Sequence, residues 1–344
     1  KEFKSVFTMS EECDDKICDQ AHHLKHKMNR KGASALIEHL NGQNPTVKFD
    51  FICLEYVRMP GAYYRQFVMG TGKTPGTPML NFLRGLRKGD KLISKGEKIN
   101  AGIIGLLSAV GYKTIEVIRQ PRVGLIATGS ELIEPQIKLS LGKIYESNSG
   151  MLQRGLQSLG YSKVAVSKIK DDYLSTLNSL EKVISENDVV IISGGISVGD
   201  YDYVGKALLA LGTKQIFYKV KQKPGKPLFF GKLNSKPIFA LPGNPASALS
   251  NFYVYVHPTL ERLSGNINFS INKGIAILES DFKKKGDRAQ FLKAHHENGK
   301  VTVLEGQSSA MLHTFATANV LAYIPWNRNK YEKGDILEII HFPT

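Results

Sequence analysis

The sequence predicts an α/β protein, with a central, open, mostly parallel sheet over residues 121–265 and a small β domain over residues 267–344. In the first segment, short apolar runs alternate with amphipathic stretches of helical length, a pattern typical of strands joined by crossover helices. In the second segment the helical patterns disappear, and short strands are separated by turns. The chain has 344 residues, which exceeds the ~250 at which a single core stops growing, so several domains are expected.

Residues 1–120 are interpreted as an N-terminal β-rich or linker region. The residues from Lys1 to Ser10 mix charged and apolar side chains and lack the apolar run and cleavage site of a signal peptide. Toward residue 120 the pattern becomes clearer, and short strands with turns lead to an apolar helical stretch over 101–110 and a strand over 114–118. The Arg-Gln-Pro-Arg segment at 119–122 is then a plausible domain boundary.

Strands and helices alternate through the α/β segment. Strands are expected at 123–127, 163–169, 188–192, 217–220, 228–233 and 237–241. Helices are expected at 149–159, 173–185, 204–211 and 246–263. The run that begins at Asp188 and continues through Ile192 suits a central strand that is buried on both faces.

The last segment is expected to form a small β domain, as a partly closed barrel. Its strands are expected at 274–278, 300–303, 320–324 and 335–340, with turns between them. No helix is expected after residue 267.

The charge balance favours an anionic partner. The chain has 46 Lys and Arg against 31 Asp and Glu, a net charge of +15, which attracts nucleic acid, acidic membrane or a small anionic substrate. The basic residues do not interleave with aromatic residues as in nucleic-acid modules, and no stretch approaches the ~20 apolar residues of a membrane helix. Only three cysteines occur, which argues against a disulfide framework. We therefore expect a cytoplasmic protein that binds neither nucleic acid nor membrane.

Four glycine-containing loops follow predicted strands of the α/β segment, at residues 128–132, 193–202, 223–227 and 241–247. Because ligands of an open α/β sheet bind at the carboxyl ends of its strands, these loops should converge on one edge. Glycine permits close approach of the backbone, and Ser, Thr and Asn donate hydrogen bonds to oxygen atoms. The helix that begins after the last loop can receive an anion at its N-terminus. The loops therefore predict a pocket for phosphate or another oxyanion.

Any one of these loops alone is more simply explained as a turn. Turn chemistry does not explain why charged residues fall inside the same loops as the glycines, namely Glu131, Asp200, Asp202, Lys223 and Lys226. Carboxylates beside an anion pocket suggest Mg²⁺, which prefers oxygen ligands and bridges carboxylates to phosphate oxygens. Asp200 and Asp202 are its candidate ligands.

In this order the loops, from Thr-Gly-Ser-Glu-Leu at 128–132 to Leu-Pro-Gly-Asn-Pro at 241–245, resemble the molybdopterin-binding domain of the molybdopterin molybdotransferase family, which includes MoeA and the gephyrin E domain. The resemblance continues into the β domain at 286–291 and 307–312. It implies a MogA-like fold for residues 121–265. The family's N-terminal motifs, such as Asn-Ser-Ala-Met-Asp-Gly-Tyr-Ala, are not found between Lys1 and Lys88.

The resemblance implies an enzyme that binds adenylylated molybdopterin, takes up molybdate, and releases AMP and the molybdenum cofactor. It implies Mg²⁺ as cofactor, a homodimer, and the molybdopterin adenylyltransferase and downstream molybdoenzymes as protein partners. The catalytic residues that it implies are Asp202, Asp171, Glu131, Lys223 and Lys226. The binding residues that it implies are Thr128, Gly129, Ser193, Gly194, Gly195, Ser197, Gly225, Pro242, Gly243, Asn244, Pro245, Ser247, Arg288 and Ser308.

Several alternatives stay open. Asp171 can equally be an ordinary helix N-cap, and Arg288 and Ser308 can be surface residues of the β domain. For the whole protein, the alternatives are a non-catalytic self-associating scaffold of the same family, an enzyme like the molybdopterin adenylyltransferases, or a nucleic-acid binder. The charged residues Asp202, Lys223 and Lys226 favour the enzyme over the scaffold. The appended β domain argues against the adenylyltransferase alternative, because the resemblance implies that adenylyltransferases share the α/β fold but lack this domain.

Overall fold

The computed structural model of the chain describes residues 4–5, 57–58, 90–169, 172–196, 203–267 and 269–343. The chain divides into two compact units. One comprises Lys1–Gln120 with Ser264–Asn268, and the other comprises Pro121–Leu263 with Phe269–Thr344. The α/β sheet and the C-terminal strands therefore belong to a single compact unit.

In the first unit, the described residues form a helix and short strands around a small core. The elements are β1 (Lys4–Ser5), β2 (Val57–Arg58), β3 (Lys91–Ile93), α5 (Ala101–Ala109) and β4 (Val117–Ile118). The helix begins after Asn100, whose side-chain oxygen accepts a hydrogen bond from the Ile103 N–H at 3.0 Å. The strand predicted over 114–118 is limited to its last two residues.

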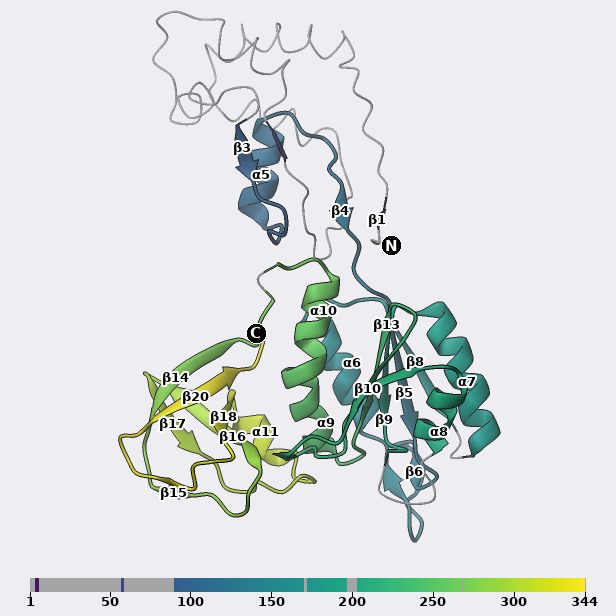
Figure 1. Cartoon of the computed structure of the whole chain (residues 1–344), viewed down its shortest axis with the longest axis vertical. Helices are drawn as coiled ribbons and strands as arrows, with labels where there is room; N and C mark the ends of the chain where they lie inside the picture. Colours follow the sequence, from purple (N-terminus) through teal and green to yellow (C-terminus); the bar gives the residue numbers. More distant parts are fainter. Residues whose placement is uncertain are drawn as a thin grey trace, which may run out of the picture. The chain divides into compact units, whose positions relative to one another are not determined.

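The second unit is built on a six-stranded sheet in the order β10-β12-β13-β9-β5-β8 (Figure 1). Its strands are β5 (Val123–Thr128), β8 (Val164–Ile169), β9 (Val189–Ser193), β10 (Lys214–Tyr218), β12 (Phe229–Leu233) and β13 (Lys236–Leu241). The four strands β13, β9, β5 and β8 run parallel, while β12 is antiparallel to both of its neighbours. The predicted open, mostly parallel sheet is confirmed.

One strand is shifted along the sequence. The structure places β10 at Lys214–Tyr218, whereas the sequence predicts a strand over 217–220. The first three residues of this edge strand are exposed, and two of them are the polar residues Lys214 and Gln215. They therefore lack the apolar pattern from which a strand is predicted.

Successive residues of the central strands face two separate cores, because side chains alternate across a strand. In β9, Val189 and Ile191 lie in one core and Val190 and Ile192 lie in the other. The first core contains residues of α6 (Asn148–Ser158), α9 (Pro245–Asn251) and α10 (His257–Leu263). The second contains residues of α7 (Tyr173–Glu186) and α8 (Tyr203–Ala210). The sheet is thus covered by helices on both faces (Figure 1).

The single helix predicted over 246–263 is interrupted by a π-helical turn, η2 (Phe252–Val256), between α9 and α10. At the start of this turn, the Phe252 side chain is completely buried. It packs closely against α6, since a Cβ atom added to Gly155 would lie 3.2 Å from the Phe252 ring. Phe252 therefore joins the two helices that cover this face of the sheet.

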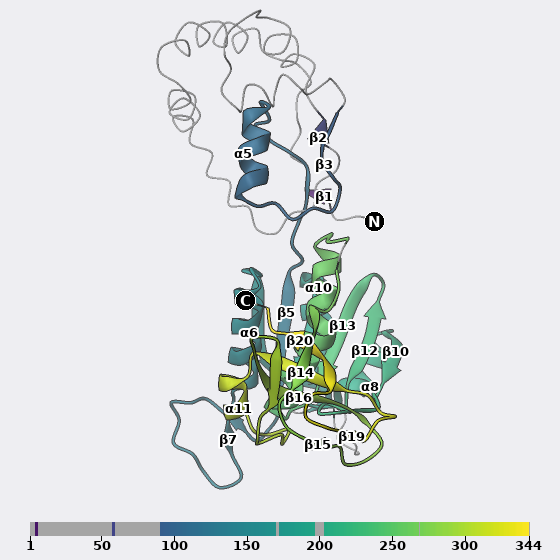
Figure 2. The same ribbon diagram turned by 90° about the vertical axis from the view of Figure 1, so that its left-hand side faces the viewer.

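The C-terminal strands close into a barrel, in which β16 pairs with β17 and β18 and the ring continues through β14 and β20 (Figure 1). Figure 2 shows β14, β16 and β20 of this barrel from another side. The strands are β14 (Lys273–Leu278), β16 (Ala289–Glu297), β17 (Lys300–Val303), β18 (Val320–Ile324) and β20 (Ile336–His341). The ring is closed, where the sequence predicts partial closure. The prediction of no helix after residue 267 is wrong for α11 (His313–Thr317), which is too short to show helical periodicity.

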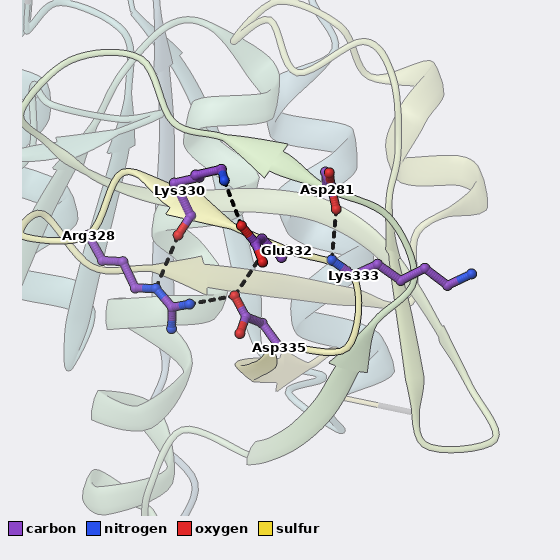
Figure 3. A network of polar contacts seen from close by, with 6 residues as sticks. All are labelled: Asp281, Arg328, Lys330, Glu332, Lys333 and Asp335. Carbon is purple, nitrogen blue, oxygen red and sulfur yellow. Dashed lines mark hydrogen bonds and ion pairs between the residues drawn. The ribbon is translucent and has the colours of Figure 1, made fainter.

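A network of polar contacts fixes the turn that precedes β20 (Figure 3). The carboxylate of Asp335 accepts hydrogen bonds from the Arg328 guanidinium and from the Glu332 N–H. The Arg328 guanidinium also lies 4.1 Å from the centre of the Tyr331 ring. At exposed positions such contacts contribute little free energy each, so their effect is to define the turn.

The barrel and the α/β sheet are joined by backbone pairing and by ring contacts. A short strand, β11 (Gln222–Lys223), leaves the α/β segment and pairs in parallel with β16. The Tyr253 ring stacks on the Phe342 ring with their centres 4.7 Å apart. No helix among the described residues is long and apolar enough to cross a membrane.

We expect Phe252→Ala to lower the free energy of unfolding by about 3–5 kcal/mol, because it leaves a cavity between α6 and the sheet. The midpoint of urea unfolding, followed by circular dichroism, measures this change. The matched control is Leu174→Ala on α7, where the side chain is 68% exposed and the change should stay within about 0.5 kcal/mol. Equal effects of the two substitutions would contradict the assigned core.

Candidate functional site

Three of the four predicted loops meet at the carboxyl ends of β5, β9 and β13. The Gly194 N–H donates a hydrogen bond to the Leu241 carbonyl oxygen at 3.1 Å. Gly194 has a φ of +91°, and a Cβ atom at this position would overlap the carbonyl oxygen of Thr128. Position 194 therefore requires glycine for two reasons, its backbone conformation and the closeness of the β5 loop.

Asn148, the first residue of α6, links two of these loops. Its side-chain Nδ2 donates hydrogen bonds to the Ser193 Oγ at 2.9 Å and to the Gly243 carbonyl oxygen at 2.7 Å. Asn148 is not among the site residues predicted from the sequence, because an asparagine at the start of a helix is readily explained as a cap. The sequence feature that could have indicated Asn148 is its position at the start of the helix that follows the 128–132 loop.

Two buried polar atoms at this edge have no hydrogen-bond partner among the described residues, the Thr128 Oγ1 and the Asn148 Oδ1. Leaving such an atom without a partner is costly, so each is a candidate for contact with a ligand. The hydroxyl can donate or accept, whereas the amide oxygen can only accept. The Thr128 side chain also lies beside Gly195, since a Cβ atom there would be 2.8 Å from the Thr128 Cγ2.

The β5 loop continues through Gly129 to Glu131, whose side chain is exposed. The Glu131 carboxylate oxygens lie 3.0 Å from the position that a Cβ atom on Gly129 would take, so the side chain folds back over its own loop. The segment then passes through β6 (Leu132–Ile133) and an exposed connection to β7 (Ile144–Tyr145). Glu131 is thus placed at the same edge as Thr128.

The described part of the chain offers no set of magnesium ligands. Among these residues, no group of three or more His, Cys, Asp or Glu side chains could hold a metal ion. The predicted residues Asp171, Ser197, Asp200 and Asp202 lie outside the described residues. The described residues alone therefore do not fit a magnesium centre.

The loop after β13 is held by the barrel. The Asn244 Nδ2 donates a hydrogen bond to the Ser309 Oγ at 3.0 Å, and the Ala246 N–H donates to the Ser309 carbonyl oxygen at 3.1 Å. Pro242 and Ser247 are buried, whereas Gly243 and Asn244 are exposed. Because Pro245 has no N–H, the first N–H of α9 already has a partner in the barrel. The predicted Ser308 is the neighbour of Ser309 and is exposed at this contact.

The fourth predicted loop packs against the opposite end of α9. The Asn251 Nδ2 donates to the Gly225 carbonyl oxygen at 3.2 Å, and the Asn251 Oδ1 accepts a hydrogen bond from the Gln222 Nε2 at 2.8 Å. The Tyr255 hydroxyl donates to the Gln222 Oε1. Burial, with a smaller contribution from Tyr323, raises the pKa of Tyr255 to about 12, so the hydroxyl keeps its proton. Lys223 and Lys226 extend from this loop and are exposed.

The barrel contributes a third basic residue beside these two lysines. The Arg288 Nη1 donates to the Gln222 carbonyl oxygen at 3.3 Å, immediately before Lys223. The neighbouring Asp287 forms an ion pair with Lys221 at 2.9 Å, and the hydrogen bond from Lys221 is the main reason that the pKa of Asp287 is lowered. Lys223, Lys226 and Arg288 thus form a group of basic residues, which we call the basic cluster.

The site therefore has two parts, one at each end of α9. We call the first part the rim, defined by Thr128, Asn148, Ser193, Gly194, Gly195 and the 242–245 loop. The rim offers polar atoms that have no partner within the described ranges, and the basic cluster offers positive charge. The 7 residues of α9 separate the two parts by about 10 Å along the helix axis. Such an arrangement can bind a ligand with more than one anionic group.

Family models match both parts of the second unit. A probable molybdopterin-binding domain matches residues 124–262, and the MoeA C-terminal region, domain IV, matches residues 276–342. The molybdopterin molybdenumtransferase of Staphylococcus epidermidis is 32% identical over 260 residues, which are 74% of this chain and 62% of that protein. The one from Bacillus subtilis is 30% identical over 258 residues, or 74% and 60% of the two chains. The chain thus spans about three fifths of the length of these relatives.

Solved structures show the same fold. A crystal structure of the MoeA protein from Pyrococcus horikoshii matches with a TM-score of 0.61 and 30% identity, covering 75% of this chain and 63% of that one. The structure of a molybdenum cofactor biosynthesis protein from Pyrococcus furiosus matches with a TM-score of 0.59 and 20% identity, and the match covers 90% of this chain and 97% of that chain. The second likeness concerns the fold alone.

We expect Thr128→Val to raise the free energy of unfolding by about 1 kcal/mol, because it replaces by a methyl group a buried hydroxyl that has no partner in the described part of the chain. Thr176→Val should give a similar gain, since the Thr176 hydroxyl is buried in the same way on α7. Ser250→Ala is the opposite control, because the buried Ser250 hydroxyl donates to the Ala246 carbonyl oxygen at 2.8 Å. This substitution should cost about 1 kcal/mol in the same urea titration.

A loss of stability in Thr128→Val comparable to that in Ser250→Ala would show that the Thr128 hydroxyl is satisfied within the folded chain. The hydroxyl would then not be available to a ligand.

Proposed function

Because the chain belongs to the MoeA family, we propose that it is a molybdopterin molybdotransferase, which inserts molybdate into adenylylated molybdopterin and releases AMP. The observation that carries this proposal is the pairing of the rim with the basic cluster at the two ends of α9. The substrates carry several anionic groups, a phosphoanhydride and an oxyanion, and the two parts of the site supply complementary groups at two separate places.

In this proposal the rim holds the adenylate phosphate. The backbone at Gly243 can approach an oxyanion closely, since this exposed residue carries no side chain and the space beside it is open. The proposal assigns the buried Thr128 hydroxyl, which lacks a partner among the described residues, as a donor to a phosphate oxygen. Gly129 and Ser193, in the same loops, extend this surface. Each of these groups is fixed before the substrate binds, which reduces the entropy lost on binding.

The basic cluster neutralises molybdate, the second anionic group of the reaction. Lys223 and Lys226 are exposed and form no ion pair within the described residues, so both charges are available to an anion. Arg288 has a planar guanidinium with several N–H donors, which suits oxyanions. Catalysis then rests on the positioning of two anions and on electrostatic stabilisation, without a covalent intermediate on a side chain.

We expect Lys226→Met to lower kcat/KM for molybdate-dependent AMP release by about 10²-fold, the scale of losing one key electrostatic group. The assay supplies adenylylated molybdopterin and molybdate and measures AMP by chromatography. The matched control is Lys232→Met, an exposed lysine on β12, which should leave the rate unchanged. A wild-type protein that binds the pterin without releasing AMP would support the scaffold alternative and contradict the proposal.

Magnesium is the part of the proposal that rests on the sequence, through Asp200 and Asp202. We expect EDTA to abolish AMP release and added Mg²⁺ to restore it. Asp202→Asn should lower the rate by at least about 10²-fold with a near-normal melting temperature, because it removes a charge and keeps the shape. The matched control is the same change of residue type in the first unit, Asp90→Asn, which should leave the Mg²⁺ dependence unchanged. Normal release by Asp202→Asn at saturating Mg²⁺ would contradict the metal assignment.

We also propose that the enzyme acts in the cytoplasm as a homodimer. The sparse cysteines support a reducing compartment, and the resemblance supports the dimer. A reaction that adenylylates molybdopterin must supply the substrate, and molybdoenzymes must consume the product. Glu131 at the rim and Asp171 complete the set of carboxylates assigned to the site.

A further inference from the structure

A lysine in the barrel wall holds the loop by which the barrel reaches the rim. Lys293 lies on β16 with only 3% of its surface exposed. Its ammonium group donates hydrogen bonds to three backbone carbonyl oxygens of one loop, those of Gly306 at 2.7 Å, Met311 at 2.9 Å and Ser308 at 3.3 Å. We call residues 306–311 the barrel loop.

The barrel loop is also the segment that contacts the start of α9. Ser309 accepts the hydrogen bond of the Ala246 N–H with its carbonyl oxygen and that of the Asn244 Nδ2 with its Oγ. The carbonyl of Ser308, on one side of this residue, is bound by Lys293. The same short loop is therefore held by the Lys293 ammonium, on the face of β16 away from the barrel core, and by the first residues of α9 at the rim.

We propose that Lys293 is a positioning residue for the transfer reaction, which fixes the barrel loop so that Ser308 and Ser309 complete the rim. This inference rests on the proposed function of the site. Lys293 does not touch the substrate itself. Its contribution is to substrate affinity, because a barrel loop that is free to move must be ordered each time the substrate binds.

The hydrogen bonds of the Lys293 ammonium all go to the barrel loop. The backbone N–H of Lys293 donates to the Gln307 Oε1 at 3.0 Å, and the Gln307 Nε2 donates back to the Lys293 carbonyl oxygen at 2.8 Å. The ammonium lies 5.6 Å from the centre of the Phe315 ring. Burial lowers the pKa of Lys293, which reflects the cost of placing a cation there. The three carbonyl groups offset this cost, and all three come from the barrel loop.

The simpler explanation is that Lys293 only stabilises the barrel, and a second buried lysine allows the two explanations to be separated. Lys284 is also 3% exposed and donates to three carbonyl oxygens, those of Trp326 at 2.7 Å, Gly286 at 3.2 Å and Arg288 at 3.3 Å. It has the same chemistry but holds a different loop. A general effect of removing a buried lysine should therefore appear in both variants, and an effect on the barrel loop should appear only in one.

The test compares Lys293→Met with Lys284→Met by hydrogen exchange and by kinetics. In Lys293→Met we expect amide exchange in residues 306–311 to become at least about tenfold faster, because the loop loses three of its anchors. In Lys284→Met exchange should rise in residues 286–288 and stay near the wild-type rate in 306–311. The KM for adenylylated molybdopterin should rise about tenfold in Lys293→Met, with kcat within about threefold of the wild type.

A control for lost stability is Val301→Ala, which removes a fully buried side chain from the barrel core. It should lower the melting temperature without raising KM or exchange in the barrel loop. If Lys293→Met does not fold, Lys293→Gln, which keeps a polar donor on a shorter side chain, takes its place with the same expected direction. The same rise in KM in Val301→Ala would overturn the proposal in favour of a purely structural lysine.

A double-mutant comparison with Ser309→Ala tests whether the rise in KM in Lys293→Met arises through the contact between Ser309 and α9. Ser309→Ala should raise KM by itself and add little in a Lys293→Met background, because both substitutions disrupt one arrangement. Fully additive effects, or unchanged exchange of 306–311 in Lys293→Met, would overturn the proposal. If the wild-type protein releases no AMP, the proposed function fails, and the exchange rates of the same variants still decide whether Lys293 holds the barrel loop.

Discussion

The contact between the β5 and β9 loops leaves no space for a side chain at position 194, and the arrangement of the rim depends on it. The Thr128 carbonyl oxygen occupies the place of a Cβ atom on Gly194, so the loops after β5 and β9 can lie this close only with glycine at position 194. The hydrogen bond from Gly194 to Leu241 then aligns the third strand with them. The rim is thus ordered by backbone contacts, which leaves the Thr128 hydroxyl without a partner among the described residues. Such an atom costs about 1–3 kcal/mol, which the two cores of the sheet offset.

Helix α9 converts this local arrangement into a site with two parts. Its first residues contact Ser309 of the barrel, and its last residue, Asn251, holds the Gly225 loop. A helix is stiff over 7 residues, so the distance between the rim and the basic cluster is set by its length rather than by flexible side chains. The barrel contacts both ends, through the barrel loop and through Arg288. Its role is therefore to fix the two loops that flank α9, in addition to closing its own core.

The parts of the fold that can be predicted from the sequence are those whose pattern is local. Strand β9 is a continuous apolar run, and the glycines that follow it indicate a loop at the end of a strand. Strand β16, the longest in the barrel, is absent from the predicted strands because the buried Lys293 and Gln290 interrupt its apolar pattern. Asn148 is absent from the predicted site because capping explains an asparagine at that place. The separation of the fourth loop from the rim depends on which end of α9 it contacts, and no local pattern carries that information. The roles of individual site residues stay predictions.

The charges of the basic cluster are the reason that we propose an anion site there. Asp287 pairs with Lys221 and so compensates one nearby cation, while Lys223 and Lys226 form no ion pair within the described residues. Arg288 donates to a carbonyl group, which carries no net charge. The positive charge that remains at this end of α9 attracts anions. The same reasoning separates the cluster from Lys284 and Lys293, whose buried charges are satisfied by carbonyl groups and therefore stabilise loops instead of attracting a substrate.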